Sequence, residues 1–274
     1  MAKSVLLKSS IGKKYWMALT GLFLCTFLVG HLAGNLQLLV PNNALNFNKY
    51  ALFMTTNPAV KLLSYLTYIS IIFHAIDGIL LAIQNKKARP IAYAKNSPSA
   101  NSSFSSRNMA VLGTLVLVFI ATHMINFWAK MHFDEKFPLQ KTTIEAQQGM
   151  KQDFYLTTDG GYIPVADQSY IIKNQTEFYD AAAKVKVKEG YKDLYKLTFD
   201  FFRDTKYGLW FTFFYVLSMA VLGFHLLHGF QSGFQTLGAN HPKYTPFIKL
   251  FGKCFAIGVP LLFAIIPIYI HFSK

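Results

Sequence analysis

The sequence predicts an all-α integral membrane protein, a five-transmembrane-helix bundle with an extracytoplasmic insertion between helices 3 and 4. Charged residues make up only 15% of the 274 residues and hydrophobic residues 53%, whereas a soluble domain carries about 25% charge. Twelve of the thirteen acidic residues lie between Asp134 and Asp204, and only Asp77 lies elsewhere. Five apolar runs are long enough to cross a membrane, which takes about 20 residues. These features exclude a soluble globular enzyme, a disordered chain and a disulfide scaffold.

The apolar runs set the order of the elements. They span roughly residues 15–40, 59–84, 108–131, 207–238 and 246–272. The first run is too long for the apolar part of a signal peptide, and no small-x-small cleavage site follows it. Membrane helices tolerate proline, so Pro260 and Pro267 are expected to bend the fifth helix without ending it. We expect helices 1–3 within residues 1–131 and helices 4 and 5 within 207–274.

Lysine and arginine beside the apolar runs predict the orientation, because cytoplasmic flanks carry an excess of them. Twelve lie on one side, namely Lys3, Lys8, Lys13, Lys14, Lys86, Lys87, Arg89, Lys95, Arg107, Lys243, Lys249 and Lys253, and three on the other, Lys49, Lys61 and Lys274. We therefore expect the N-terminus inside and the C-terminus outside. The net charge of +14 is divided among these clusters and forms no basic face, so nucleic acid is not expected as a partner.

The segment 132–206 is the one polar stretch of the chain. Residues 130–206 hold twelve basic and twelve acidic residues, and long loops cross a membrane regardless of charge. A turn is expected at 159–161 (DGG), and the stretch 178–202 contains helix-like segments. We expect a small extracytoplasmic cap with a packing or stability role, and a flexible inside loop at 96–106.

Histidines lie inside the apolar runs, where ionisable residues are costly and commonly functional. They are His31, His74, His123, His225 and His228, spread over four of the five runs. A single histidine of this kind commonly bonds to a neighbouring helix, but one on each of four helices indicates a shared role. The two cysteines, Cys25 and Cys254, lie in separate apolar runs. Thiolate ligation of an iron–sulfur cluster and attachment of a c-type haem are therefore excluded.

Depth sorts the histidines into two pairs. His31 and His123 each follow the inner start of a helix by 16 residues, or about 24 Å at the helical rise. His74 and His228 each precede an inner helix end by 12 residues, or about 18 Å. His31 with His123 forms the outer pair and His74 with His228 the inner pair. His225 lies three residues from His228 on one helical face, so it is the alternative inner ligand.

Two facing imidazoles without carboxylate or thiolate neighbours suit a haem iron bound from both faces. Structural zinc takes four ligands, and catalytic zinc takes three plus an open position. An iron with two axial histidines has no open position, so it carries electrons and does not activate oxygen. The sequence therefore predicts two haems b that together form an electron path across the membrane.

Each residue near the histidines has two possible roles. Five glycines near the histidines leave space for a haem edge or serve helix packing; they are Gly30, Gly34, Gly78, Gly223 and Gly229. Asp77 is a candidate proton shuttle or a polar bridge between helices. Lys14 and Arg107 are candidates for binding haem propionates, although cations at helix ends commonly snorkel.

Several segments resemble the dihaem cytochrome b subunit (cytochrome b558 type) of succinate:quinone oxidoreductases, the membrane anchor of succinate dehydrogenase and fumarate reductase. Its first helix resembles 10–14 (SIGKK), 17–22 (MALTGL) and 31–37 (HLAGNLQ). Its second-helix ligand segment resembles 73–78 (FHAIDG). Its fourth-helix signature resembles 227–238 (LHGFQSGFQTLG) and 240–244 (NHPKY). Asp77 and the long insertion depart from the family pattern.

This resemblance implies a function. His31 and His123 would bind the iron of a distal haem b, and His74 and His228 that of a proximal one. A flavoprotein subunit and an iron–sulfur subunit would be partners on the cytoplasmic face of a bacterial inner membrane. Electrons would pass between the iron–sulfur subunit and membrane quinone, usually menaquinone. The chain itself has no flavin or phosphate-binding motif, so alone it would not act on succinate or fumarate.

Other functions remain open on the sequence. One is the cytochrome b anchor of a formate dehydrogenase or a hydrogenase. Another is a haem-free transporter or proton channel with a histidine relay, and a third is a purely structural anchor. For the quinone, Asn35, Gln37 and Trp128 lie toward the outer end, where polar and aromatic residues are also common as belt residues.

Overall fold

The structure is a computed structural model that describes residues 9–91, 97, 100, 102–145 and 150–273. Its contacts divide the chain into two units. The bundle unit comprises Met1–Asn35, Leu62–Ala121 and Thr212–Tyr269, and the mixed unit comprises Leu36–Lys61, Thr122–Phe211 and Ile270–Lys274. Lys3, Lys8, Lys95, Lys274 and part of the predicted loop at 96–106 lie outside the described residues.

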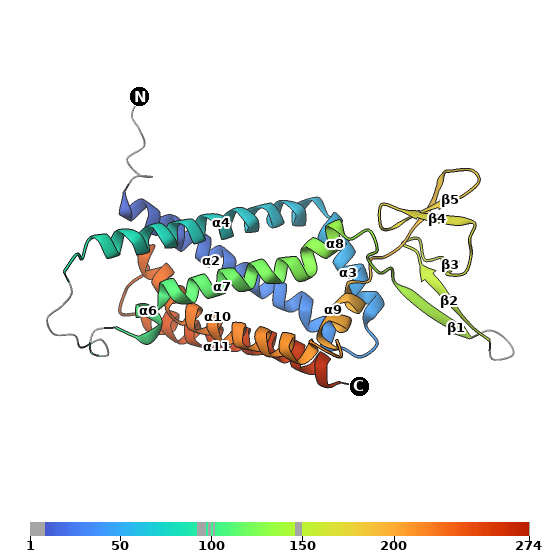
Figure 1. Ribbon diagram of the computed structural model, residues 1–274. Coiled ribbons are helices and arrows are strands. Elements are labelled where there is room, and N and C mark those ends of the chain that lie inside the picture. The colour runs from blue at the N-terminus through green and yellow to red at the C-terminus, as the bar shows by residue number, and fades with distance from the viewer. Residues whose placement is uncertain (1–8, 92–96, 98–99, 101, 146–149, 274) are drawn as a thin grey trace, which may run out of the picture. The chain divides into compact units, whose positions relative to one another are not determined.

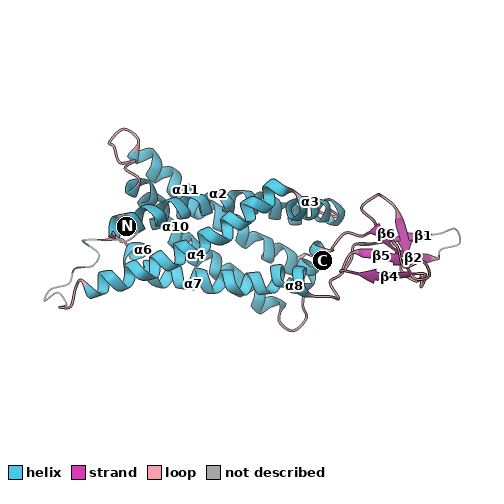
Figure 2. Ribbon diagram, turned by 90° about the horizontal axis from the view of Figure 1, so that it is seen from above, coloured by secondary structure: helices cyan, strands magenta, loops and turns pink. Residues whose placement is uncertain are grey.

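Five long helices confirm the predicted spans to within a few residues. They are α2 (Ser10–Asn35), α4 (Pro58–Lys87), α7 (Met109–His123), α10 (Gly208–Thr236) and α11 (Thr245–Phe272). Each lies in a helical stretch that is long and apolar enough to cross a membrane, which indicates a multi-pass membrane protein. In the bundle unit these helices lie side by side (Figures 1 and 2). The helix α11 continues through Pro260 and Pro267.

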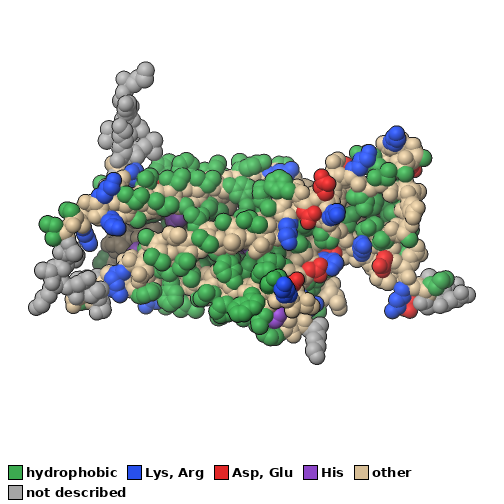
Figure 3. All heavy atoms as spheres, viewed as in Figure 1, with side chains coloured by type: hydrophobic (Ala, Val, Ile, Leu, Met, Phe, Trp, Pro, Cys, Tyr) green, Lys and Arg blue, Asp and Glu red, His purple; other side chains and the backbone are tan. Residues whose placement is uncertain are grey.

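The bundle has a small buried core and a broad apolar exterior. Its core consists of Cys25, Met219, Leu222, Leu226, Phe230, Ala256 and Ala264. Leu62 and Phe247 illustrate the exterior, with exposed fractions of 61% and 68%. Hydrophobic side chains cover much of the helical surface seen in Figure 3. Such a surface suits lipid, and helices satisfy their backbone hydrogen bonds without water.

The basic residues gather at one end of the bundle. Lys13 and Lys14 lie at the start of α2, and Lys86 and Lys87 lie in the last turn of α4. Arg107 ends the short helix α6 (Phe104–Arg107), which falls within the loop predicted to be flexible. The prediction that this end faces the cytoplasm rests on this asymmetry, and the orientation itself stays a prediction.

The mixed unit contains the insertion between the third and fourth long helices. Two antiparallel three-stranded sheets have the orders β1-β2-β3 and β4-β5-β6 (Figure 2). The strands are β1 (Lys141–Glu145), β2 (Lys151–Leu156), β3 (Tyr162–Pro164), β4 (Tyr170–Lys173), β5 (Glu177–Asp180) and β6 (Lys186–Glu189). The register places Thr143 opposite Asp153 and Ile172 opposite Phe178. Leu139, Ile163 and Phe178 form the buried core.

The prediction of an all-α chain is wrong for the insertion, which contains two β-sheets. The local predictions for this segment are only partly right. The turn at 159–161 is confirmed, with Gly160 at φ 83° and a 3.0 Å bond from the Thr157 N–H to the Gly161 carbonyl. The helix-like stretch 178–202 is wrong for its first half, which contains β5 and β6, and right for α9 (Leu194–Phe202). In β5, Phe178 is buried while Glu177 and Tyr179 on either side are less so, because successive side chains of a strand point to opposite faces.

A buried polar network joins α9 to α3 (Ala44–Thr56), a helix that the sequence analysis did not predict. The Asn48 amide, 1% exposed, donates to Gln140 and, over 2.8 Å, to the Asp193 carboxylate. The Asn48 carbonyl accepts a 3.0 Å bond from the Tyr195 N–H. Asp193 also caps α9 by accepting from the Lys196 N–H at 2.9 Å. These bonds fix α9 against α3 within the mixed unit.

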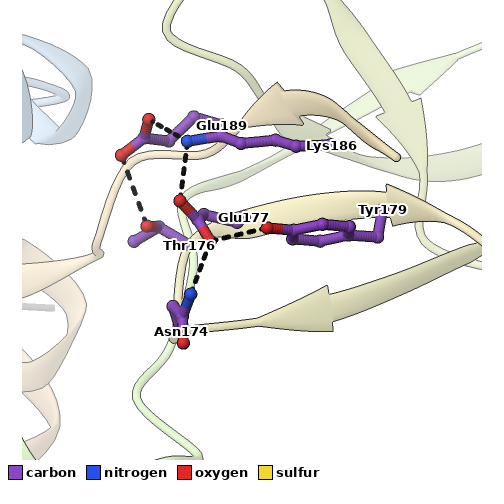
Figure 4. Close-up of polar contacts among 6 residues, drawn as sticks. All are labelled: Asn174, Thr176, Glu177, Tyr179, Lys186 and Glu189. Carbon is purple, nitrogen blue, oxygen red and sulfur yellow. Dashed lines mark hydrogen bonds and ion pairs between the residues drawn. The ribbon is translucent and has the colours of Figure 1, made fainter. Parts of the chain in front are cut away.

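A second polar cluster lies on the sheet β4-β5-β6 (Figure 4). The Lys186 ammonium donates to Glu177 at 2.8 Å and to Glu189 at 3.0 Å. Asn174 and Tyr179 also donate to Glu177, at 2.6 Å and 3.4 Å. The bond from Lys186 holds the pKa of the Glu177 carboxyl below its usual range, and Glu177 raises the pKa of Lys186. Lys186 therefore pairs with both carboxylates of the cluster.

Candidate functional site

Two of the intramembrane histidines meet inside the bundle. The imidazole rings of His74, on α4, and His225, on α10, have centroids 6.1 Å apart and an angle of 72° between their planes. The helices α2 and α7 approach the same place with Gly21 and Gly113, which face the two rings. Four helices therefore converge on one pair of imidazoles.

The His74 ring is held by α2. Its Nδ1 atom lies 3.1 Å from the Met17 carbonyl oxygen and 3.3 Å from the Thr20 hydroxyl. A carbonyl oxygen can only accept, so Nδ1 carries the hydrogen and donates it. The ring is then the neutral tautomer whose Nε2 lone pair is available to a metal.

The His225 side chain is half-buried, and one of its polar atoms is fully buried. Its Nδ1 atom makes no hydrogen bond to any of the residues that the structure describes. Leaving a buried polar atom unsatisfied costs about 1–3 kcal/mol, and an unobserved ion or ligand is one explanation for such an atom. The ring lies over Gly113, where an added Cβ would come within 3.5 Å of its Cε1 atom.

The donor set and its spacing fit a haem iron. A first-row metal binds imidazole nitrogen at about 2.0–2.1 Å, so two opposed ligand nitrogens lie about 4 Å apart and the ring centres lie farther out. The 6.1 Å between the centroids of His74 and His225 agrees with this arrangement. Among the described residues no group of three or more His, Cys, Asp or Glu could hold a metal ion. A pair of imidazoles suits an iron that takes its other ligands from a porphyrin.

The structure places the alternative ligand, His225, beside His74. His228, which the depth argument preferred, makes no hydrogen bond or aromatic contact with any described residue, whereas His225 contacts His74. The two lie three residues apart, and helix ends are uncertain by a residue or two, so depth alone separates them poorly. One sequence signal for His225 was missed. His74 and His225 share a spacing, since each is followed four residues later by a glycine, Gly78 and Gly229.

His31 lies among aromatic side chains of the bundle unit. Its ring stacks on Phe27 with centroids 5.3 Å apart and lies 5.7 Å from the ring of Phe263, on α11. The Asn35 amide donates a 2.8 Å bond to the His31 carbonyl and lies 3.4 Å from the His31 Nδ1 atom. Asn35, a candidate quinone residue, therefore contacts the predicted outer ligand.

His123 lies where the third long helix changes from α-helical to π-helical geometry. It ends α7 and is followed by the π-helical turn η2 (Met124–Ala129) and by α8 (Lys130–Phe133). Its ring is 5.3 Å from Phe127, which contacts Phe201 of α9 at 5.3 Å. Single π-turns are frequent at functional sites. His123 belongs to the mixed unit and His31 to the bundle unit, so their pairing stays a prediction.

The other candidate residues make contacts of their own. Trp128 contacts His132 with ring centroids 4.5 Å apart, and the backbone carbonyl of Gln37, in η1 (Leu36–Leu39), accepts a 3.2 Å bond from Asn43. Lys14 and Arg107 are exposed at the basic end of the bundle, and Arg107 donates to the Ser102 carbonyl. Their predicted roles toward quinone and propionates are not tested by these contacts.

Asp77 and the predicted glycines differ in their surroundings. Asp77 is half-buried on α4 and interacts electrostatically with Lys13 and His74. A Cβ at Gly30 or Gly78 would meet nothing within 4 Å, which leaves space beside the histidines. At Gly223 it would lie 3.1 Å from the Ala256 carbonyl, so that glycine serves the packing of α10 on α11.

Comparisons with known proteins found no matching family model, no similar curated protein and no similar solved structure.

Proposed function

We propose that this chain is the dihaem cytochrome b anchor subunit of a succinate dehydrogenase or fumarate reductase. In this role it transfers electrons between the iron–sulfur subunit of the complex and membrane quinone, most simply menaquinone. The observation that carries the proposal is the His74–His225 pair, two half-buried imidazoles whose centroids lie 6.1 Å apart between four apolar helices. The sequence resemblance in the first, second and fourth long helices supports the same assignment.

The chain's own residues have defined tasks in this proposal. His74 and His225 would hold the proximal haem b, and His31 and His123 the distal one. When bound, each haem supplies a one-electron carrier. The Met17 carbonyl orients His74, while the apolar bundle excludes water and so tunes the potential. Neutral imidazoles on both sides leave no position for oxygen or substrate.

The basic end of the bundle suits the partner subunits. Lys13, Lys14, Lys86, Lys87 and Arg107 lie there. The flavoprotein and iron–sulfur subunits would dock at this cytoplasmic end, next to the inner haem. The chain holds neither flavin nor iron–sulfur motifs, so catalysis on the dicarboxylate belongs to those partners. The quinone and membrane lipid contact the chain directly.

One observation favours a second candidate, a haem-free histidine relay. Asp77 interacts electrostatically with His74, and His74 contacts His225. These three groups could pass protons through the inner half of the membrane. That function predicts a colourless protein that conducts protons without any redox partner.

The electron donor that reduces the chain distinguishes the candidate functions. Membranes containing the full complex are given succinate, formate or hydrogen, and the b-type absorption bands are recorded. We expect succinate to reduce the bands and the other two donors to leave them oxidised. Reduction by formate or hydrogen alone would assign the chain to another respiratory dehydrogenase, and a colourless chain would favour the histidine relay.

A further inference from the structure

Three residues of α2 lie around the ring of His74. The Met17 carbonyl accepts from Nδ1 at 3.1 Å, and the Thr20 hydroxyl oxygen lies 3.3 Å from the same nitrogen. Gly21 faces the ring carbon Cε1. We call this set, Met17, Thr20 and Gly21, the His74 seat.

The hydrogen atoms of the seat can be assigned. The Thr20 hydroxyl lies 2.8 Å from the Trp16 carbonyl, an acceptor, so it donates there. Its oxygen then has a lone pair free to accept from the Nδ1–H of His74. Thr20 is only 8% exposed, so water does not compete at this position. The Met17 carbonyl and the Thr20 hydroxyl therefore stabilise the same tautomer.

Gly21 sets the position of the ring. A Cβ at Gly21 would lie 3.0 Å from Cε1 and 3.4 Å from Nδ1 of His74. Contacts this short force a neighbour to move, and here the neighbour is a ring that two acceptors hold. A side chain at position 21 would therefore displace the imidazole from its present orientation.

We infer that Thr20 and Gly21 are positioning residues that orient His74, and thereby set the affinity and the midpoint potential of the haem it would bind. The inference rests on the proposed function. Groups that accept from the outer nitrogen of a metal-bound histidine raise its basicity, and their loss typically costs 10- to 100-fold in metal affinity or activity. A more basic imidazole favours the ferric state, so removing the acceptor raises the midpoint potential.

The test compares matched variants of the full chain in its complex. Thr20→Val removes the hydroxyl at nearly constant volume, and Thr20→Ser restores it. Thr26→Val is the control, because the exposed Thr26 bonds only to the Leu22 carbonyl of its own helix. Gly21→Ala adds the clashing Cβ, and Gly258→Ala is its control, since a Cβ there would meet nothing within 4 Å.

The readouts are the haem content, the electron paramagnetic resonance spectrum of the ferric haems and the two midpoint potentials. We expect Thr20→Val to raise one midpoint by up to about 59 mV, which corresponds to a tenfold change in equilibrium constant for one electron. Thr20→Ser should return to the wild-type value. Gly21→Ala should shift the ferric signal of one haem or lower its occupancy, and both controls should match the wild type.

Two results would overturn the inference in different ways. In the first, the wild-type chain binds two haems, and Thr20→Val and Gly21→Ala have the same midpoint potentials and ferric spectrum as the wild type. This result overturns the role of the His74 seat but not the proposed function. A wild-type chain without haem overturns both. If Thr20→Val yields no folded protein, Thr20→Ala removes the same hydroxyl and carries the same expectation.

Discussion

His225 approaches His74 at a ring-centroid separation of 6.1 Å, and the Nδ1 atom of His225 is buried without a hydrogen-bond partner among the described residues. A pair of this kind is costly in an apolar bundle unless something is bound to it. Around it, Gly21 and Gly113 leave room for the rings and the Met17 carbonyl fixes one tautomer. The proposed function explains this combination, since His74 and His225 would be held ready to bind a haem iron.

The choice between His225 and His228 can be tested directly. We expect His225→Ala and His74→Ala each to lower the haem content from two to one per chain, because each removes one axial ligand of the same iron. His228→Ala should retain two haems. The measurement is haem per polypeptide by pyridine haemochrome. Loss of haem in His228→Ala with full retention in His225→Ala would restore the assignment that depth favoured.

The buried network of the mixed unit should contribute to stability. Asn48→Ala removes the bonds that Asn48 makes to the Asp193 carboxylate and to the Tyr195 N–H. A lost bond to a charged group costs about 1.5–3 kcal/mol and a neutral one about 1 kcal/mol, so we expect a loss of about 2–4 kcal/mol.

Chemical denaturation of the purified chain, followed by the fluorescence of the tyrosines, measures this loss. Asn46→Ala is the control on the same helix, because the exposed Asn46 bonds only to Asn43. Equal midpoints for the Asn48 and Asn46 variants would contradict the structural role of Asn48.

The turn at 157–161 should lose stability in acid. Bonds from the Thr157 hydroxyl and the Gly161 N–H lower the pKa of Asp159 to about 2, against about 3.9 for an unfolded chain. A depressed carboxyl pKa stabilises the fold above the unfolded value, and that stabilisation is lost as the pH falls through the folded one.

Hydrogen exchange at the Gly161 amide should therefore accelerate between about pH 4 and pH 2, after correction for intrinsic rates. Asp159→Asn should remove this pH dependence. Asp200→Asn serves as the control, since Asp200 pairs with Lys196 on α9. An unchanged profile in the Asp159 variant would contradict the assignment.

Gly223 should tolerate no side chain, because its neighbour is a backbone carbonyl. A Cβ there would lie 3.1 Å from the Ala256 oxygen, and overpacking of this kind costs about 1–3 kcal/mol. We expect Gly223→Ala to lower the thermal midpoint of the detergent-solubilised protein, while Gly258→Ala leaves it unchanged. Equal melting of the two variants would argue against close packing of α10 on α11.

The positions of the long helices along the chain could be predicted, but the rotation of each helix about its own axis could not. Long apolar runs with charged ends predict five spans because a membrane requires both features. These runs are apolar on nearly all sides, so the sequence does not show which face of α2 or α7 meets a neighbour. Gly21 and Gly113 were missed for that reason, and His225 was placed second to His228.

The mixed unit was harder to predict, because its strands are only three to six residues long and carry many charges. Each strand pairs with a neighbour along the chain, and a bridge between distant residues, Leu139 with Lys192, lies outside the strands. The turn at 159–161 was predictable because its signal is local, in consecutive residues.

The measurement that tests the central claim most directly is a dithionite-reduced minus oxidised visible spectrum of the purified full-length chain, with haem counted per polypeptide. The account predicts b-type bands and two haems per chain. A folded but colourless protein would contradict it and would favour the histidine relay.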